Sequence, residues 1–223
     1  MAGERLDEQA MALRAVKEFR DGMVVNLGVG IPTLCSLYVP PDLDVIFHSE
    51  NGIIGFGPVV TDPAEADVDL VNASIQPVKP RPGMAIVDHA ESFAIIRGGR
   101  IDITVLGAVQ VSERGDLANH QLPGKALGSL GGGMDLAFNA KRVIVVMTHT
   151  TKDGQPKIVR ELTQPLTAPR CVSLIITDIA VVEVTPQGLL LRELVPGWTP
   201  EEVQALTAAP LKVAQDLKVM ELL

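Results

Sequence analysis

Apolar residues follow a helical spacing at two places in the chain. Between Arg5 and Arg20 they recur every three or four residues, which predicts an amphipathic helix that Asp21-Gly22 ends; they are Leu6, Ala10, Leu13, Val16 and Phe19. Further on, Thr199-Pro200-Glu201-Glu202 has the order of a capping box with proline in the first turn. This segment predicts a second helix, through Leu206.

Short runs of aliphatic and β-branched residues predict the strands. These runs span residues 23–27, 45–47, 85–87, 102–106, 143–147, 173–177, 180–184 and 189–194. Several are continuously apolar, which is typical of strands covered on both faces. The pattern therefore predicts an α/β fold, an open mixed sheet flanked by helices. With only a stiff proline-rich surface connection at 77–82, residues 1–223 are expected to form a single domain.

Three glycine-rich turns follow or precede these elements. One spans 28–32, with Pro32 near the first position of an expected helix, one is Ser49-Glu50-Asn51-Gly52, and one is 131–133. Asn-Gly favours a tight turn, so Glu50 should be held firmly at a strand end. If the turns converge, Glu50 is a candidate nucleophile, although most glutamates beside such turns are solvated surface residues.

Composition and charge narrow the class of protein. Of the 223 residues, 47% are hydrophobic and 21% charged, and no apolar run reaches membrane-spanning length. Without a signal-peptide pattern, and with Cys35 and Cys171 far apart, we expect a cytoplasmic protein with both thiols reduced in the core. A net charge of −8 with scattered basic residues argues against nucleic acid. The four histidines lack metal-ligand spacing, so no metal is expected.

A series of ordered motifs carries a family resemblance. They are Asn-Leu-Gly-Val-Gly-Ile-Pro (26–32), Ser-Glu-Asn-Gly (49–52), Glu-Ser-Phe-Ala-Ile-Ile-Arg-Gly-Gly (91–99), Gly-Asp-Leu-Ala-Asn (115–119), Pro-Gly-Lys (123–125) and Gly-Gly-Gly-Met-Asp-Leu (131–136). Together they resemble the β subunit of class I CoA-transferases, nearest to the 3-oxoacid group that uses succinyl-CoA and acetoacetate. The resemblance implies the fold shared with ribose-5-phosphate isomerase and glucosamine-6-phosphate deaminase, and an α subunit that completes the active site.

The resemblance also implies a mechanism and roles for particular residues. Glu50 would attack the acyl-CoA thioester and then carry CoA as a glutamyl thioester, in a ping-pong reaction with CoA as substrate and no permanently bound cofactor. Glutamate is ionised at neutral pH, so no general base is needed. Gly132 would donate a backbone N–H to an oxyanion, and Gly131, Asn51 and Asn26 would complete the oxyanion and CoA-binding region. Without the resemblance, 131–133 would be a plain helix-entry loop.

The chain departs from the family pattern at several positions. Ile75 replaces a lysine implicated in CoA contact, for which Lys79 or Arg81 could substitute. His120 replaces a tryptophan, and Ser129 and Gly133 replace a glycine and an alanine beside the glycine pair. Lys125 could face substrate or stand in an exposed turn. Two alternatives therefore stay open: an acyl-CoA hydrolase on the same scaffold, and a non-catalytic CoA-binding subunit.

Overall fold

The computed structural model describes residues 3–121 and 131–222. Its strands are β1 (Val24–Leu27), β2 (Ile46–Ser49), β3 (Ile53–Ile54), β4 (Ala85–Ile86), β5 (Ile103–Leu106), β6 (Gln110–Ser112), β7 (Leu117–Ala118), β8 (Arg142–Val146), β9 (Ile158–Val159), β10 (Val172–Ile176), β11 (Ala180–Thr185), β12 (Gly188–Leu194) and β13 (Leu211–Val219). Its helices are α1 (Glu8–Val16), η1 (Ile31–Leu37), η2 (Pro63–Glu65), α2 (His89–Arg97), α3 (Gly133–Asn139) and α4 (Pro200–Ala205), of which η1 and η2 are 3₁₀-helices.

The main sheet is mixed and has ten strands in the order β13-β12-β11-β10-β8-β5-β1-β2-β3-β4. The central strands β2, β1, β5, β8 and β10 are parallel, and antiparallel pairs flank them at β10–β11–β12 and β2–β3–β4. Strands β7, β6 and β9 form a second, small sheet. The predicted α/β fold with a mixed sheet is confirmed. That residues 1–223 form one domain stays a prediction.

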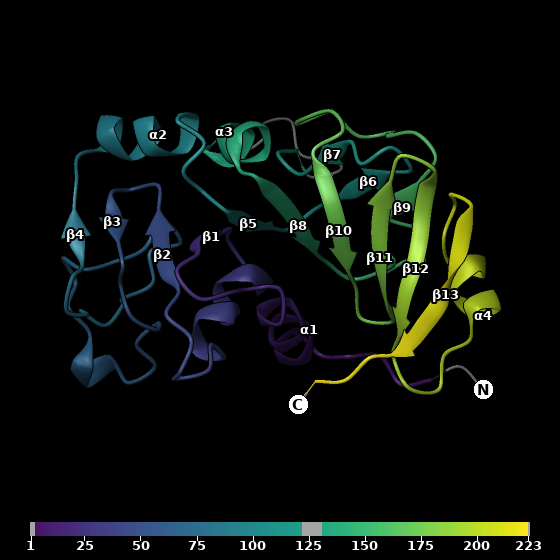
Figure 1. Ribbon diagram of the computed structural model, residues 1–223, viewed down its shortest axis with the longest axis horizontal. Helices are drawn as coiled ribbons and strands as arrows, with labels where there is room; N and C mark the ends of the chain where they lie inside the picture. The colour runs from purple at the N-terminus through teal and green to yellow at the C-terminus, as the bar shows by residue number, and fades with distance from the viewer. Residues whose placement is uncertain (1–2, 122–130, 223) are drawn as a thin grey trace.

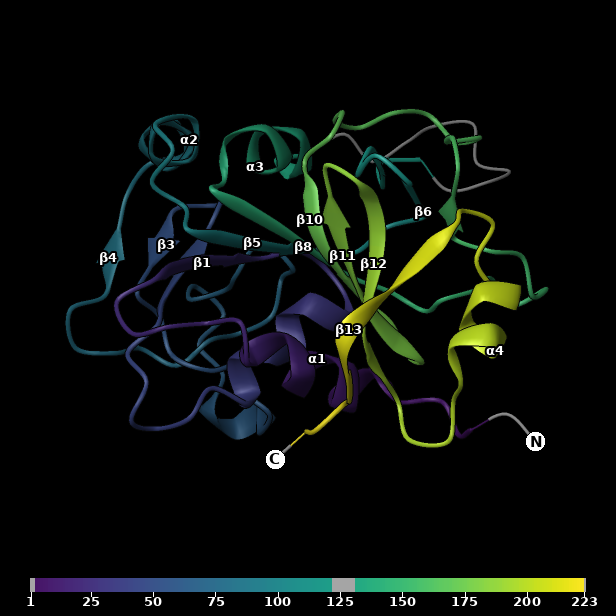
Figure 2. The same ribbon diagram turned by 45° about the vertical axis from the view of Figure 1, so that its right-hand side comes forward.

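Helices cover the central strands on both sides. Figures 1 and 2 show α2 and α3 above these strands and α1 below them. Helix α3 contacts β5 and α2, while α1 contacts η1, β8 and β10. All four residues of β5 are buried, the polar Thr104 included. Because the central strands are parallel, the segments that follow β1, β2 and β5 meet at the same end of the sheet, beyond the carboxyl ends of these strands.

Two helix predictions need correction. The first helix begins later than predicted, because the Asp7 side chain accepts a hydrogen bond from the Ala10 N–H at 2.8 Å and caps it there, and it ends earlier, at Val16. The segment after Gly30 is a 3₁₀-helix. In it, the hydroxyls of Thr33 and Ser36 donate to carbonyl oxygens three residues earlier, a pattern compatible with this tighter turn. The capping box at Thr199 is confirmed.

Some strands carry no apolar signal or depart from the expected burial. Strand β13 lies at the edge of the sheet and leaves most of its residues exposed, among them Lys212, Asp216 and Lys218, whose charges limit unwanted pairing. Strand β4 is apolar but exposed, because it forms the opposite edge. Segment 77–82 is more than a surface connection: Val78 is buried and pairs with Val59.

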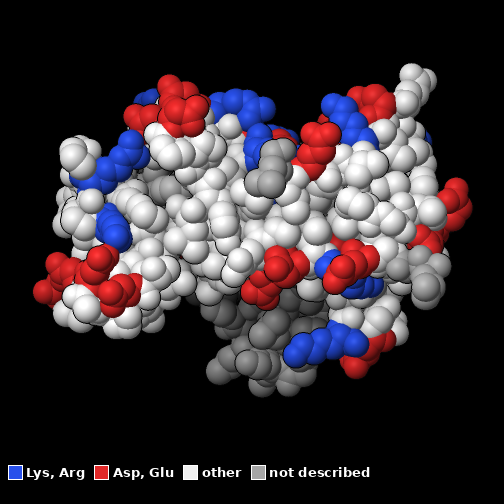
Figure 3. Space-filling model, turned by 90° about the horizontal axis from the view of Figure 1, so that it is seen from below, with Lys and Arg blue, Asp and Glu red and all other residues white. Residues whose placement is uncertain are grey.

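Several bulk properties can be compared with the sequence. No helix in 3–121 or 131–222 has the length and apolar character of a membrane span. On the face seen from below, lysine and arginine lie interspersed with acidic side chains (Figure 3). Cys35 is buried as predicted, whereas Cys171 is only half-buried; both are free thiols, and burial raises the pKa of each to about 12.

His149 is a fully buried histidine that follows β8. Its Nδ1 lies 3.0 Å from Thr177 Oγ1 and its Nε2 lies 2.8 Å from Thr207 Oγ1. Its backbone N–H donates to Asp178 Oδ1 at 2.7 Å. Burial lowers the pKa of His149 to about 4, and the nearby Asp178 carboxylate offsets only part of this effect. Both ring nitrogens of His149 thus have a threonine hydroxyl as hydrogen-bond partner, which is typical of a structural histidine.

His149 is expected to make the protein less stable in mild acid. Below pH about 6.5 the unfolded chain takes up a proton, whereas the folded chain does so only near pH 4. The free energy of unfolding should therefore fall by roughly 3 kcal/mol across that interval. Denaturant unfolding of the wild type and of His149→Gln, compared at several pH values, measures this term as the difference between the two slopes. Equal slopes, together with an imidazole that titrates near 6.5 by NMR, would contradict it.

Candidate active site

Glu50 lies in the short hairpin loop between β2 and β3. The Gly52 N–H donates to the Ser49 carbonyl at 2.9 Å and closes the turn. Gly52 has φ 112°, and a Cβ placed there would lie 2.1 Å from the Val87 carbonyl oxygen, so only glycine fits. The loop thus fixes the half-buried Glu50 at the end of a central strand, as the sequence predicts.

The glycines at the start of α3 reach Glu50. A Cβ built on the buried Gly132 would lie 3.3 Å from Glu50 Oε1 and 3.2 Å from Phe93 Cζ of α2. Gly131 is exposed, and a Cβ there would meet nothing within 4 Å. Two of the three predicted turns therefore converge, with Gly132 beside the carboxylate and no room between them for a larger side chain.

Asn26 of β1 approaches the same carboxylate from the sheet. Its side chain is fully buried, and its Nδ2 lies 3.4 Å from Glu50 Oε2 and 3.0 Å from the His48 carbonyl oxygen. No hydrogen bond between Glu50 and the turn at 28–32 is found among the described residues, so β1 contributes Asn26 instead. Glu50 therefore has one amide donor near Oε2 and the Gly132 backbone beside Oε1.

The segment 71–76 packs beside the Glu50 loop. The Ala73 N–H donates to Ser49 Oγ at 2.8 Å, and the exposed Asn51 side chain donates to the Val71 carbonyl at 2.7 Å. Asn51 thus ties two loops together through its amide. Ile75 in this segment is 83% exposed and has φ 60°, which is a strained conformation for a β-branched residue.

The two cations proposed to replace the missing lysine have other partners. Lys79 Nζ lies 2.8 Å from Glu65 Oε2, and the Arg81 guanidinium pairs with Asp44 and donates to the Val45 carbonyl. Both ion pairs are exposed, so that Lys79 or Arg81 replaces the missing lysine stays a prediction. The apolar Ile75 leaves this part of the loop without a charge.

The motif at 115–119 also lies near the glycine turn. A Cβ on Gly133 would be 3.8 Å from Asn119 Nδ2, and the Thr167 hydroxyl donates to Asn119 Oδ1 at 2.9 Å. His120 Nδ1 lies 3.0 Å from the same hydroxyl. Lys125 of the Pro-Gly-Lys motif and Ser129 lie outside the described residues. Within the described ranges, no group of three or more His, Cys, Asp or Glu side chains is placed to hold a metal ion.

Three further residues border the site, and the sequence alone assigned no role to them. Phe93 and Ser92 come from α2, and His48 precedes the turn on β2. The motif 91–99 marked the α2 segment but did not indicate which side chains face Glu50. Buried polar residues on a strand carry no periodic signal, so only the three-dimensional arrangement identifies His48.

Replacing Gly132 by alanine tests the close approach to Glu50. The new methyl group would lie at 3.3 Å from Oε1 and 3.2 Å from Phe93, so the carboxylate or the ring must shift by a few tenths of an ångström. Activity should fall about 10-fold, because small displacements of reacting groups are costly. Gly133→Ala is the matched control, since its methyl group would meet only ordinary contacts at 3.8 Å. Equal kcat/KM for the two variants would contradict the expectation.

Comparison with known proteins gives a consistent assignment. The model of the coenzyme A transferase family matches residues 9–206. The β subunit of a probable coenzyme A transferase of Bacillus subtilis is 47% identical over 93% of this chain and 95% of its own length. One subunit of the 3-oxoadipate CoA-transferase of Acinetobacter baylyi is 46% identical over 95% of this chain and 97% of its own. The human mitochondrial succinyl-CoA:3-ketoacid coenzyme A transferase 2 is 47% identical over 99% of this chain, which spans 43% of the human protein.

Solved structures agree with this assignment. An acyl-CoA transferase of Escherichia coli O157:H7, in a thioester complex with CoA, superposes with a TM-score of 0.76 at 26% identity, over 99% of this chain and 44% of that one. Fold, motifs and relatives therefore define a CoA-transferase. The chain belongs to the coenzyme A transferase family, and the resemblance predicted from its motifs is confirmed.

Proposed function

We propose that this chain is the β subunit of a 3-oxoacid-type CoA-transferase whose nucleophile is Glu50. The observation that supports this most directly is the half-buried carboxylate, held by a closed turn, with the Asn26 amide at Oε2 and the Gly132 backbone at Oε1. A weak nucleophile needs such a fixed setting. The reaction moves CoA from an acyl-CoA to a carboxylate.

The steps balance without an added cofactor. Glu50 Oε1 attacks the thioester carbonyl, the C–S bond breaks, and CoA leaves as thiolate while an acyl-glutamyl anhydride forms. The thiolate then attacks the glutamyl carbonyl, and the first carboxylate leaves with the bridging oxygen. An acceptor carboxylate reverses both steps and regenerates the ionised Glu50.

Two donors are available for the charge that develops. Asn26 Nδ2 lies near Oε2, which remains on the glutamyl carbon and carries negative charge when the thiolate attacks. Gly132 is our candidate for the oxyanion of the acyl group, as the resemblance implies, with Gly131 and Asn51 at the border of the CoA-binding region. Loss of one oxyanion donor typically costs about 2.7 to 4 kcal/mol in the barrier.

An α subunit is the proposed partner. Relatives of matching length are named as subunits, and the human relative carries a matching segment within a longer chain. Ile75 and Ile86 expose most of their apolar side chains in segments that border the Glu50 loop, as expected of a surface that another chain covers. We place the assembly in the cytoplasm on the basis of its free thiols.

Succinyl-CoA and acetoacetate, a ketone body, are the proposed substrates, by resemblance to the 3-oxoacid group. The Acinetobacter relative is named for 3-oxoadipate, so we expect the residues that line the acceptor pocket to differ between it and an acetoacetate enzyme. The apolar Ile75, in place of a lysine, favours an altered contact with CoA or its acyl group.

Kinetics of the assembled enzyme test this function against hydrolysis. The chain is purified with its α partner and supplied with succinyl-CoA, with and without acetoacetate. A transferase gives parallel double-reciprocal plots and releases little CoA without an acceptor. Steady CoA release without acetoacetate would show a hydrolase, in which water resolves the glutamyl thioester. Consumption of neither substrate would indicate a non-catalytic subunit.

A further inference from the structure

A row of buried polar side chains crosses the sheet beside the Glu50 loop. His48 of β2 pairs in register with Asn26 of β1, and Asn26 pairs with Thr104 of β5. All three are at most 1% exposed. Ser92 of α2 is also fully buried, and its hydroxyl lies 3.1 Å from His48 Nε2. Polar groups this deep in a sheet require an explanation, because burying them costs free energy unless they are paired.

The Asn26 side-chain amide is oriented so that its NH₂ group has acceptors but its oxygen has no hydrogen-bond donor among the described residues. Its Nδ2 faces three acceptors, namely His48 Nδ1 at 3.2 Å, the His48 carbonyl oxygen at 3.0 Å and Glu50 Oε2 at 3.4 Å. Among the described residues, Asn26 Oδ1 is buried without a hydrogen-bond partner. A buried orphaned acceptor costs about 1–3 kcal/mol. The reversed amide would place Oδ1 against these acceptors, so the neighbours determine the observed direction.

The contacts of His48 also determine its tautomer. Because Nδ1 faces the Asn26 NH₂ group, it acts as an acceptor and the proton lies on Nε2. Nε2–H then donates to Ser92 Oγ, whose hydroxyl donates to the Ser49 carbonyl at 3.4 Å. Burial lowers the pKa of His48, which keeps the ring neutral at physiological pH. The donors therefore all point the same way, from the Asn26 amide to His48, from His48 to Ser92, and from Ser92 to the Ser49 carbonyl oxygen.

We propose that His48 and Ser92 are positioning residues that hold the Asn26 amide with its N–H toward Glu50. The inference rests on the proposed role of Glu50 as nucleophile. Ser92 fixes the His48 ring, and the ring presents Nδ1 to Asn26. One hydrogen of the Asn26 amide is then shared between His48 Nδ1 and the His48 carbonyl oxygen, and the other points to Glu50 Oε2. Oε1 is left beside Gly132 as the attacking atom. The unpaired Asn26 Oδ1 costs stability, but the same amide orientation places an N–H at Glu50 Oε2 and so orients the carboxylate.

Two substitutions at His48 separate the two contacts of the ring. Asparagine can place an acceptor near the position of Nδ1 but cannot reach Ser92, whereas glutamine can reach Ser92 but leaves Asn26 without the Nδ1 acceptor. Thr104→Val is the matched control, because Thr104 is equally buried beside Asn26 and its hydroxyl has no hydrogen-bond partner among the described residues. Ser92→Ala removes the anchor of the ring.

The test measures the single-turnover rate of glutamyl-CoA formation from succinyl-CoA in the assembled enzyme. His48→Gln should lower this rate about 10-fold with little change in the KM for succinyl-CoA. His48→Asn should keep most of the wild-type rate. Ser92→Ala should fall between the two, and Thr104→Val should match the wild type. Wild-type rates in His48→Gln and Ser92→Ala, or an equal loss in Thr104→Val, would overturn the inference.

NMR of the full chain separates this inference from the proposed function. Imidazole ¹⁵N shifts should show His48 with its proton on Nε2, and Ser92→Ala should shift the Asn26 side-chain amide resonances more than Thr104→Val does. If both NMR results are found but the wild type forms no CoA adduct, the role of Glu50 as nucleophile is refuted while the role of His48 and Ser92 in orienting Asn26 stands. A proton on Nδ1 would refute the positioning whatever the activity.

Discussion

Replacing Glu50 by alanine should lower CoA transfer by at least about 10³-fold, because the covalent route loses its nucleophile. Within residues 3–121 and 131–222 the side chain makes one long hydrogen bond, to Asn26 at 3.4 Å, so we expect little stability to depend on it. The thermal midpoint should therefore stay close to that of the wild type. Measuring kcat/KM and thermal unfolding of the variant with its α partner checks both statements.

An exposed carboxylate provides the control for this experiment. Glu91 is exposed in the first turn of α2, where it contributes at most a modest interaction with the helix dipole. Glu91→Ala should keep its transfer activity within about twofold, as expected of an exposed surface substitution. Substantial transfer by Glu50→Ala would assign the chemistry to another group.

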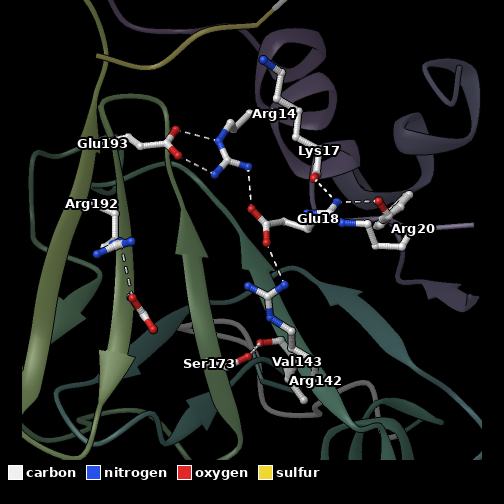
Figure 4. Close-up of polar contacts among 11 residues, drawn as sticks. Arg14, Lys17, Glu18, Arg20, Arg142, Val143, Ser173, Arg192 and Glu193 are labelled. Carbon is white, nitrogen blue, oxygen red and sulfur yellow. Dashed lines mark hydrogen bonds and ion pairs between the residues drawn. The ribbon is translucent and has the colours of Figure 1, made fainter. Parts of the chain in front are cut away.

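Replacing Arg14 by alanine should destabilise the protein by about 3–5 kcal/mol, the range for removing one partner of a buried ion pair. Arg14 is 6% exposed and lies between two carboxylates (Figure 4). It binds Glu193 through two hydrogen bonds of 2.7 Å and Glu18 through one of 2.8 Å. Glu18 also pairs with Arg142 at 2.7 Å, so α1, β8 and β12 are joined.

The network explains why this substitution is costly. Burial alone would raise the pKa of Glu18, but hydrogen bonds and charges from Arg14 and Arg142 lower it on balance. Without Arg14, Glu193 would lose its bidentate partner and Glu18 one of its two. Both would then be poorly compensated charges at the α1 face of the sheet.

Arg192 offers a matched control one residue from Glu193. Its side chain is 38% exposed and pairs with Asp216 at 3.2 Å and Glu183 at 3.5 Å. Such surface pairs contribute about 0–1 kcal/mol. Denaturant unfolding of Arg14→Ala and Arg192→Ala should therefore differ by several kcal/mol, and equal losses would show that the Arg14 network adds nothing beyond surface pairing.

The sequence predicts the centre of this fold better than its edges. The run at 143–147 is unbroken because β8 is buried on both faces, and burial is what an apolar run reports. Strand β13 escapes prediction because it lies at an edge and exposes charged residues. The 3₁₀ form of η1 depends on hydroxyl contacts that apolar spacing does not encode.

The candidate site shows the same division. The Asn-Gly turn and the glycines around it mark Glu50 locally, but its approach to Gly132, far along the chain, follows from the packing of α3 beside the sheet. Asn26 could be named from the resemblance alone. His48 and Ser92 could not, because their role lies in hydrogen-bond directions that exist only once β2 and α2 are packed together.

Intact-protein mass spectrometry of the chain with its α partner, after incubation with succinyl-CoA, tests the role of Glu50 most directly. We expect a covalent CoA adduct that peptide mapping places on Glu50 and that disappears when acetoacetate is added. An adduct on another residue, or none in the folded assembly with any acyl-CoA, would contradict this role.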